Sequence, residues 1–220
     1  MSILQKMGIS KNSPSEVLLT SFNSKKDPHA AAVGVYLLNE KKVKMNLFGD
    51  TQTYKNLSNS GEAVANIVSD PELIIKGGLP DIFSPPLKTF SFETAKKVNA
   101  PYLSKADAFL EFEIKEMKEK TLNDDIGFSK YFETIGSVKN IEILNDNPHT
   151  LKRSDFYLIE SSVLASKAIS ARKKGKKEKF NDLVDEISFF KQKSQKIAPK
   201  SRTSNLILDI LDHLDGKINE

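Results

Sequence analysis

Short apolar runs separated by turn residues dominate the first half of the chain. Alternating or nearly continuous hydrophobic positions predict β-strands at 16–22, 30–37, 43–48 and 62–68. Residues 108–114 alternate with period two, which predicts a strand with one wet face. Residues 131–144 predict another strand or a pair of strands, with Gly136 as a bend. The pattern indicates a mainly antiparallel β domain.

Helical segments interrupt and follow these strands. A hydroxyl-rich stretch at 51–57 predicts a helix with Thr51 or Thr53 as its N-cap, and Asp70-Pro71 predicts a short helix through Leu79. Helical spacing replaces strand patterns beyond Pro148 and predicts amphipathic helices over 151–166, around 180–190 and at 206–214. We therefore predict a β-barrel domain over 1–147 and a helical appendage over 148–220, an α+β fold class.

Composition and motifs exclude several kinds of chemistry. The chain has no cysteine, which excludes disulfides, thiolate metal sites and cysteine nucleophiles. Its three histidines show no metal-ligand spacing, and we expect no metal site. Neither a G-x-S-x-G elbow nor a G-x-G-x-x-G dinucleotide fingerprint is present. The carboxylates are scattered, so the catalytic residues stay unknown, and any chemistry here belongs to a bound cofactor.

Cellular location follows from hydropathy. The chain has no apolar run long enough to span a membrane, and its N-terminus lacks the apolar core of a signal peptide. We therefore expect a soluble, cytoplasmic protein with no membrane partner.

Three features are compatible with a ligand. A helix start rich in hydroxyls presents free N–H groups and the positive end of a dipole, so the 51–57 stretch is either an anion site or an ordinary cap. The small residues of 30–34 indicate either close packing under a helix or room for a flat ligand against the backbone. Asn66, inside an apolar strand, needs a partner from the backbone or from a ligand.

A basic segment at 167–179 carries seven lysine or arginine residues against one acid, Glu178. Such a segment is able to contact phosphates. However, no interleaved aromatic residues or nucleic-acid motif accompany it, and Gly175 indicates a turn between helices. We favour a solvated turn over a nucleic-acid interface.

A set of motifs in a fixed order resembles one protein family. The matching pieces are EVLLTS at 16–21, DPHAAAVGV at 27–35, T-x-T-Y-x-N-L at 51–57, AVANIVSDP at 63–71, APYL with DAFLE at 100–111, and R-x-x-FYLIESSV at 153–163. Together they resemble archaeal proteins of unknown function with the FMN-binding split-barrel fold, relatives of flavin reductases and pyridoxamine-phosphate oxidases. Two positions depart from that pattern: His29 and Lys152 stand where asparagine is common.

The resemblance implies a homodimer with the cofactor FMN at the subunit interface. It implies that the isoalloxazine ring lies near Thr20 and Ser21 and the backbone of Ala31 and Ala32. It also implies that the phosphate end of FMN is held by Thr51, Thr53, Tyr54 and Asn56. By the same resemblance, Asn66 touches the flavin or braces the site, and Arg153 reaches the phosphate or anchors the appendage.

Three functions are compatible with these residues. The first is an FMN-dependent oxidoreductase of flavin reductase-like type, with a reduced nicotinamide as a candidate electron donor. The second is a flavin-binding carrier or sensor without turnover. The third, which we disfavour, is nucleic-acid binding through residues 167–179.

Overall fold

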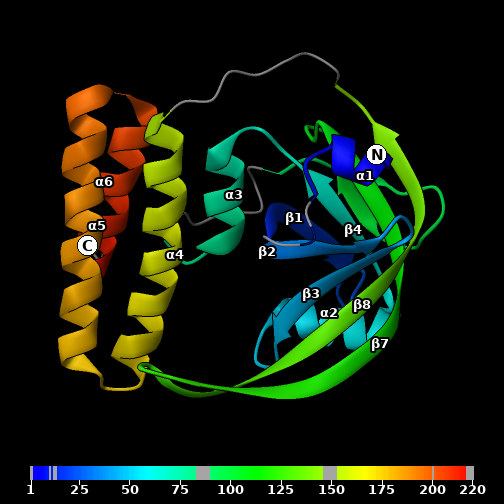
Figure 1. Ribbon diagram of the computed structural model, residues 1–220, viewed down its shortest axis with the longest axis horizontal. Helices are drawn as coiled ribbons and strands as arrows, with labels where there is room; N and C mark the ends of the chain where they lie inside the picture. Colours follow the sequence, from blue (N-terminus) through cyan, green and yellow to red (C-terminus); the bar gives the residue numbers. More distant parts are fainter. Residues whose placement is uncertain are drawn as a thin grey trace. The chain divides into compact units, whose positions relative to one another are not determined.

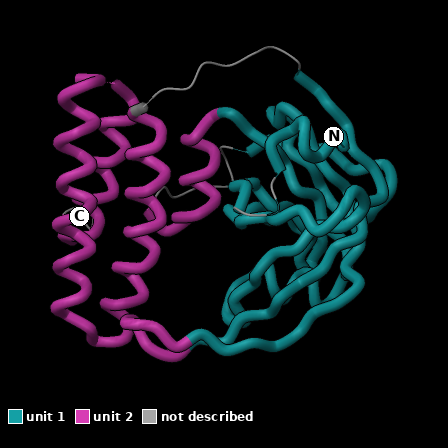
Figure 2. The backbone as a smooth tube through the Cα atoms, in the orientation of Figure 1, with its two compact units in different colours: residues 1–69, 87–122, 129–147 teal, residues 70–86, 123–128, 148–220 magenta. Residues whose placement is uncertain are grey.

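The structure is a computed structural model that describes residues 2–9, 11, 14–82, 90–145, 153–199 and 201–216 (Figure 1). Its contacts divide the chain into two units (Figure 2). Unit 1 comprises residues 1–69, 87–122 and 129–147, and unit 2 comprises residues 70–86, 123–128 and 148–220. The predicted domain of 1–147 placed residues 70–86 and 123–128 with the strands, whereas their contacts group them with the helices.

Unit 1 is built on a closed barrel that contains six strands in the order β1-β2-β3-β8-β7-β4. The strands are β1 (Ser15–Phe22), β2 (Pro28–Asn39), β3 (Lys42–Phe48), β4 (Glu62–Ile67), β7 (Ala108–Asp124) and β8 (Gly127–Ile143). The described pairs run antiparallel. The predicted antiparallel barrel is therefore confirmed. A short helix, α1 (Ile3–Lys6), precedes it and places Leu4 in its core.

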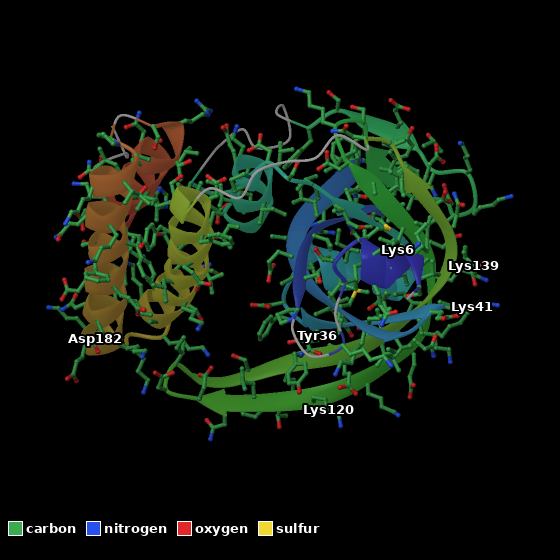
Figure 3. The ribbon with its side chains drawn as sticks, turned by 45° about the horizontal axis from the view of Figure 1, so that its top comes forward. Lys6, Tyr36, Lys41, Lys120, Lys139 and Asp182 are labelled. Carbon is green, nitrogen blue, oxygen red and sulfur yellow. The ribbon has the colours of Figure 1, made fainter. Side chains whose placement is uncertain are left out.

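Alternate residues of each strand fill the barrel interior, as the period of a strand requires. Val17 and Leu19 of β1 lie in the same buried cluster as Met45 of β3 and Phe112 of β7. The outer face of the long hairpin of β7 and β8 carries polar residues instead, and Lys120 and Lys139 are exposed there (Figure 3). Both strands are longer than the predicted 108–114 and 131–144, and β8 runs through Gly136 as one strand.

Within the closed barrel, one edge of β2 is only partly paired, and the unpaired part is an open strand edge. This strand pairs with β1 from Pro28 to Val35, but in the described part of the chain it pairs with β3 only from Val35 onward. The helix α2 (Gln52–Ser60) contacts β1, β2 and β3. It ends at Gly61, whose φ of 68° is the left-handed conformation that glycine adopts without strain. The first half of β2 is thus a strand edge close to α2.

The segment 90–107 covers the outer face of β1, β4 and β7. It contains a two-stranded sheet of β5 (Phe92–Thr94) and β6 (Pro101–Leu103), which the sequence pattern did not predict. Val98 and Ala100 form a buried cluster with Val64 and Phe109, and the ring of Tyr102 stacks on Phe109 at 4.4 Å between centroids. The described residues leave out 83–89, which precede this segment.

Unit 2 is helical and contains α3 (Pro71–Gly78), α4 (Arg153–Lys173), α5 (Lys177–Ile197) and α6 (Arg202–Leu214). Asp70 caps α3, as the Asp-Pro pair predicts, and Gly175 makes the predicted turn between α4 and α5 with a φ of 68°. Alanines 165, 168 and 171 of α4 share a core with apolar residues of α3, α5 and α6. Ile75 and Leu79 belong to this core, which is why α3 groups with the helices. Among the described residues, no helix is long and apolar enough to cross a membrane.

Candidate functional site

The first turn of α2 is fixed by Thr51. Its Oγ1 accepts a hydrogen bond from the N–H of Tyr54 at 3.2 Å and donates one to the carbonyl of Phe48 at 2.7 Å. Thr51 is therefore the N-cap, and Thr53 lies inside the helix. The first N–H groups of any helix have no partner within that helix. Positive dipole ends and free amides of this kind favour anions.

Four polar side chains meet between β1, β2 and the inner face of α2. Ser21 and His29 are direct cross-strand partners, so their side chains lie on the same face of the sheet. Thr53 and Asn56 are one helical turn apart and share a face of α2. His29 Nε2 lies 3.1 Å from Thr53 Oγ1, and Asn56 Nδ2 donates to Ser21 Oγ at 3.1 Å. We name Ser21, His29, Thr53 and Asn56 the β2–α2 cluster.

Three members of the β2–α2 cluster are withdrawn from solvent, and His29 is half-buried. Ser21, Thr53 and Asn56 are at most 3% exposed, and Gln52 donates to Asn56 Oδ1 at 2.6 Å. Burial lowers the pKa of His29 below its ordinary value, because desolvation disfavours the imidazolium. The imidazole is therefore neutral at pH 7. The described residues contain no group of acidic or histidine side chains able to hold a metal ion.

The strand edge beside this cluster is lined by small side chains. Ala31 and Ala32 are half-buried, and they lie in the part of β2 that has no described pairing to β3. Backbone N–H and C=O groups along such an edge are available to a ligand. The arrangement thus fits both halves of a flavin mononucleotide: a planar ring along small residues, and a phosphate near hydroxyl, imidazole and helix N–H donors.

Thr20 and Asn66 lie on the other side of the barrel wall, because neighbouring residues of a strand point to opposite faces. Asn66 Nδ2 donates to Leu18 O at 2.8 Å and to Thr20 Oγ1 at 2.9 Å, and Asn66 Oδ1 accepts from Leu103 N at 2.8 Å. Thr20 Oγ1 donates to Pro101 O at 2.5 Å. These contacts attach β6 to the barrel. They give Asn66 backbone partners, one of the two alternatives that the sequence left open.

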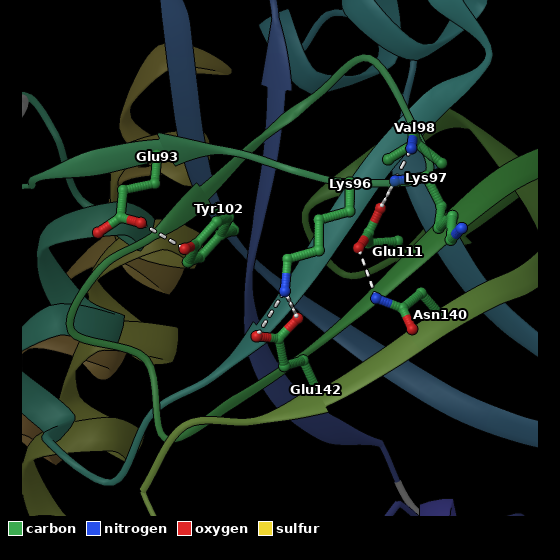
Figure 4. A network of polar contacts seen from close by, with 8 residues as sticks. All are labelled: Glu93, Lys96, Lys97, Val98, Tyr102, Glu111, Asn140 and Glu142. Atoms are coloured by element: carbon green, nitrogen blue, oxygen red, sulfur yellow. Dashed lines mark hydrogen bonds and ion pairs between the residues drawn. The ribbon is translucent and has the colours of Figure 1, made fainter.

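The buried carboxylate of Glu111 attaches the segment 90–107 to the barrel at a second place (Figure 4). Glu111 is 0% exposed and accepts hydrogen bonds from Lys97 N at 2.5 Å, Val98 N at 3.1 Å and Asn140 Nδ2 at 2.8 Å. Figure 4 also shows Lys96 paired with Glu142 at 2.9 Å. Glu111 was not among the predicted residues, since a single acid in an alternating strand has the pattern of a solvent-facing position.

The structure brings together only part of the predicted site. Ser21, Thr53 and Asn56 meet, with His29 and Gln52 added, whereas Thr20 and Asn66 belong to the outer face. The ring of Tyr54 stacks on Phe132 at 4.1 Å between centroids. Arg153 begins α4 in unit 2, and its side chain lies outside the described residues. Strand register would have pointed to His29, because it places this residue opposite Ser21.

The basic segment forms the end of α4, the turn at Gly175 and the start of α5. Lys174 Nζ donates to the carbonyl of Phe128 at 3.1 Å, and Lys179 pairs with Asp125. Residues 172–178 are exposed. The predicted turn at Gly175 is present and exposed, with part of its charge balanced by the tip of the β7–β8 hairpin.

Comparison with known proteins adds to this geometry. The family model described as "Protein of unknown function (DUF447) N-terminal domain" matches residues 15–130. An uncharacterized protein of Methanocaldococcus jannaschii, MJ1453, is 29% identical over 182 residues, which cover 81% of this chain and 88% of that protein.

One solved structure shows the same fold over nearly the whole chain. The FMN-bound protein MM1853 from Methanosarcina mazei superposes with a TM-score of 0.70 at 18% identity, over 96% of this chain and 99% of that one. A flavoredoxin of Desulfovibrio vulgaris is similar at 15% identity and a TM-score of 0.49, over 60% of this chain and 71% of its own. The barrel described above superposes on MM1853 and has the split-barrel fold that the sequence resemblance implied.

Proposed function

Since the chain belongs to the DUF447 family of proteins of unknown function, we propose that it is an FMN-binding flavoprotein and an oxidoreductase of flavin reductase-like type. The FMN-bound protein MM1853 supports this proposal, because it shares the fold over nearly the whole of both chains. One observation carries the proposal. The open edge of β2 lies beside the first turn of α2, and the hydrogen bond between His29 and Thr53 joins the strand to the helix.

Each part of the cluster has a role in this proposal. Thr53 and the first N–H groups of α2 hold the phosphate, and the backbone of Ala31 and Ala32 orients the ring. Ser21 and Asn56 hold β1 against α2 through their hydrogen bond of 3.1 Å, which keeps the strand edge and the helix start in register. FMN, when bound, supplies hydride or electron transfer, while the protein supplies binding, orientation and hydrogen bonds.

The proposal includes a homodimer with FMN at the subunit interface and a reduced nicotinamide as electron donor. The half-buried small residues of β2 support an interface at this edge, because a ring bound there is covered only when a second surface closes over it.

The first test is the visible absorption spectrum of the freshly purified protein, with mass identification of any molecule released on denaturation. Flavin bands and released FMN are the expected result. The apoprotein is then titrated with FMN alongside the variants Thr53→Val and Lys55→Ala, which change the buried and the exposed face of α2. Thr53→Val is expected to weaken FMN binding by about tenfold, the value of one lost hydrogen bond to a charged group, with Lys55→Ala unchanged.

Turnover separates an enzyme from a carrier. Reduced nicotinamide is added to the FMN-loaded protein, and loss of the flavin absorption band is followed under anaerobic conditions. Rapid bleaching supports an oxidoreductase, whereas stable flavin bands support a carrier or sensor. Protein that stays colourless after FMN is added contradicts the proposal as a whole.

A further inference from the structure

We propose that His29 is the positive partner of the FMN phosphate and that its imidazole takes up a proton from solvent when FMN binds. This inference rests on the proposed function, because it requires the phosphate to lie at the first turn of α2. It adds that one further side chain, His29, contacts the phosphate and makes the affinity for phosphorylated flavins depend on pH.

The geometry places His29 beside any anion that Thr53 holds. Thr53 is the second residue of α2, so its hydroxyl and N–H group both lie in the first turn. His29 Nε2 is 3.1 Å from that hydroxyl, and Thr53 is only 3% exposed. A phosphate oxygen that contacts Thr53 Oγ1 therefore lies close to the imidazole. Hydrogen bonds between an imidazolium and a phosphate are of the strong, charge-assisted kind.

Other charged groups around His29 point to solvent. The strand β1 has no ionisable side chain from Val17 to Phe22. In the turn before β2, Lys25, Lys26 and Asp27 are exposed, and Asp27 pairs with Asn23 at 3.0 Å. On the α2 side, Asp50 and Lys55 are exposed and the ring of Tyr54 lies on Phe132. Of the described ionisable groups on these elements, His29 alone hydrogen bonds to the buried face of α2.

These surroundings set the direction of the pH effect. Without FMN, burial lowers the pKa of His29, and the imidazole is neutral at pH 7. A phosphate dianion beside it favours the charged form and raises that pKa. Binding therefore takes up as much as one proton per FMN, and affinity increases as pH falls from about 8.5 towards 6.5, above the phosphate's own pKa of about 6. Affinity changes about tenfold for each pH unit over which the free imidazole is neutral and the bound imidazole is charged.

The test is calorimetric titration of the apoprotein with FMN in buffers of different ionisation enthalpy. It compares the natural chain with His29→Gln, which keeps an amide able to reach Thr53 but carries no charge. His213→Gln, in α6 of unit 2, is the matched control. Riboflavin, which has the same ring and no phosphate, is the second ligand. Circular dichroism and thermal unfolding check each variant, and His29→Asn replaces His29→Gln if that variant does not fold.

The expected result is proton uptake and about tenfold tighter FMN binding at about pH 6.5 than at about pH 8.5 in the natural chain and in His213→Gln. His29→Gln is expected to show no uptake and a flat profile, and riboflavin to bind without pH dependence. A flat FMN profile in the natural chain overturns the role of His29 and leaves flavin binding standing. The same is true of unchanged uptake in His29→Gln, or of equal pH dependence with riboflavin. Absence of FMN binding at every pH overturns both this inference and the proposed function.

Discussion

Asn56 shows how one buried amide connects two elements. It is 2% exposed, donates to Ser21 Oγ and accepts from Gln52 Nε2 at 2.6 Å. The variant Asn56→Ala is expected to lower the free energy of unfolding by about 1–3 kcal/mol, because it leaves the buried Ser21 hydroxyl without this partner. Urea denaturation measures the loss, and Lys55→Ala on the exposed face of α2 is the control. Equal stability of both variants would contradict the structural role of Asn56.

Glu111 is a fully buried acid with hydrogen-bond partners on two sides. It accepts two backbone N–H groups from the 90–107 segment and the side-chain amide of Asn140. Glu111→Ala is expected to cost about 3 kcal/mol or more, because buried donors lose a charged acceptor. Denaturant unfolding measures this cost against Glu116→Gln, a partly exposed acid on the same strand that pairs with Lys118. A loss below that of the control variant would count against Glu111 as the anchor of this segment.

At the residue scale, prediction from sequence was most accurate where the role of a residue depends on its neighbours in the chain. A hydroxyl cap at Thr51 or Thr53 follows from the residues ahead of a helical pattern, and the structure selects Thr51. The need of Asn66 for a partner follows from its place in an apolar strand. The sequence did not predict that Thr20 and Ser21 would separate into different networks. That outcome depends on which face of β1 turns inward, and the nearly continuous apolar run of this strand leaves the facing undefined.

At the scale of elements, β8 depends on a glycine for close packing rather than for a bend. A Cβ built on Gly136 would lie 2.6 Å from Cδ2 of Phe112, inside the barrel. Gly136→Ala is therefore expected to lower stability by about 1–3 kcal/mol through overpacking. Thermal unfolding of Gly136→Ala and of Gly136→Ala with Phe112→Leu tests the cause. Recovery of part of the loss in the double variant is expected, and a further additive loss would contradict it.

Element lengths were harder to predict than element types. The strands β7 and β8 extend well past their apolar alternation, since an antiparallel hairpin continues by backbone pairing even where both faces are polar. The sheet of β5 and β6 was missed for a related reason: its strands are three residues long and carry too short a pattern to detect. Their stability comes from Thr20, Asn66 and Glu111, which are distant in sequence.

At the scale of the whole molecule, unit 2 joins α3 to helices that follow more than seventy residues later in the chain. Glu72 of α3 pairs with Arg202 of α6, with Nη2 and Oε1 2.5 Å apart, and with Lys76 at 2.5 Å. The hydrogen bond from Arg202 is the largest cause that lowers the pKa of Glu72 to about 2. The carboxylate is therefore charged over most of the acid range in the folded state.

The pH dependence of unfolding tests this ion pair. Because the folded pKa of Glu72 is below its ordinary value of 4.5, its contribution is complete above pH 4.5 and is lost as pH falls towards about 2. Arg202 is largely exposed, so screening reduces the contribution to about 1 kcal/mol. Glu72→Gln is expected to flatten the stability profile in this acid window, as measured by urea denaturation. Glu116→Gln serves as the control, and an unchanged slope in Glu72→Gln would contradict the assignment.

The sequence by itself determined the antiparallel barrel, the helical C-terminal region, the hydroxyl-rich start of α2 and the family resemblance. These follow from local periodicity, capping and motif order, all of which act over a few neighbouring residues. Only the tertiary structure decided that α3 joins the helices, that Glu111 is buried, and that His29 meets Thr53 beside an open strand edge. Such contacts depend on strand register and on packing between distant segments, and no local pattern encodes them.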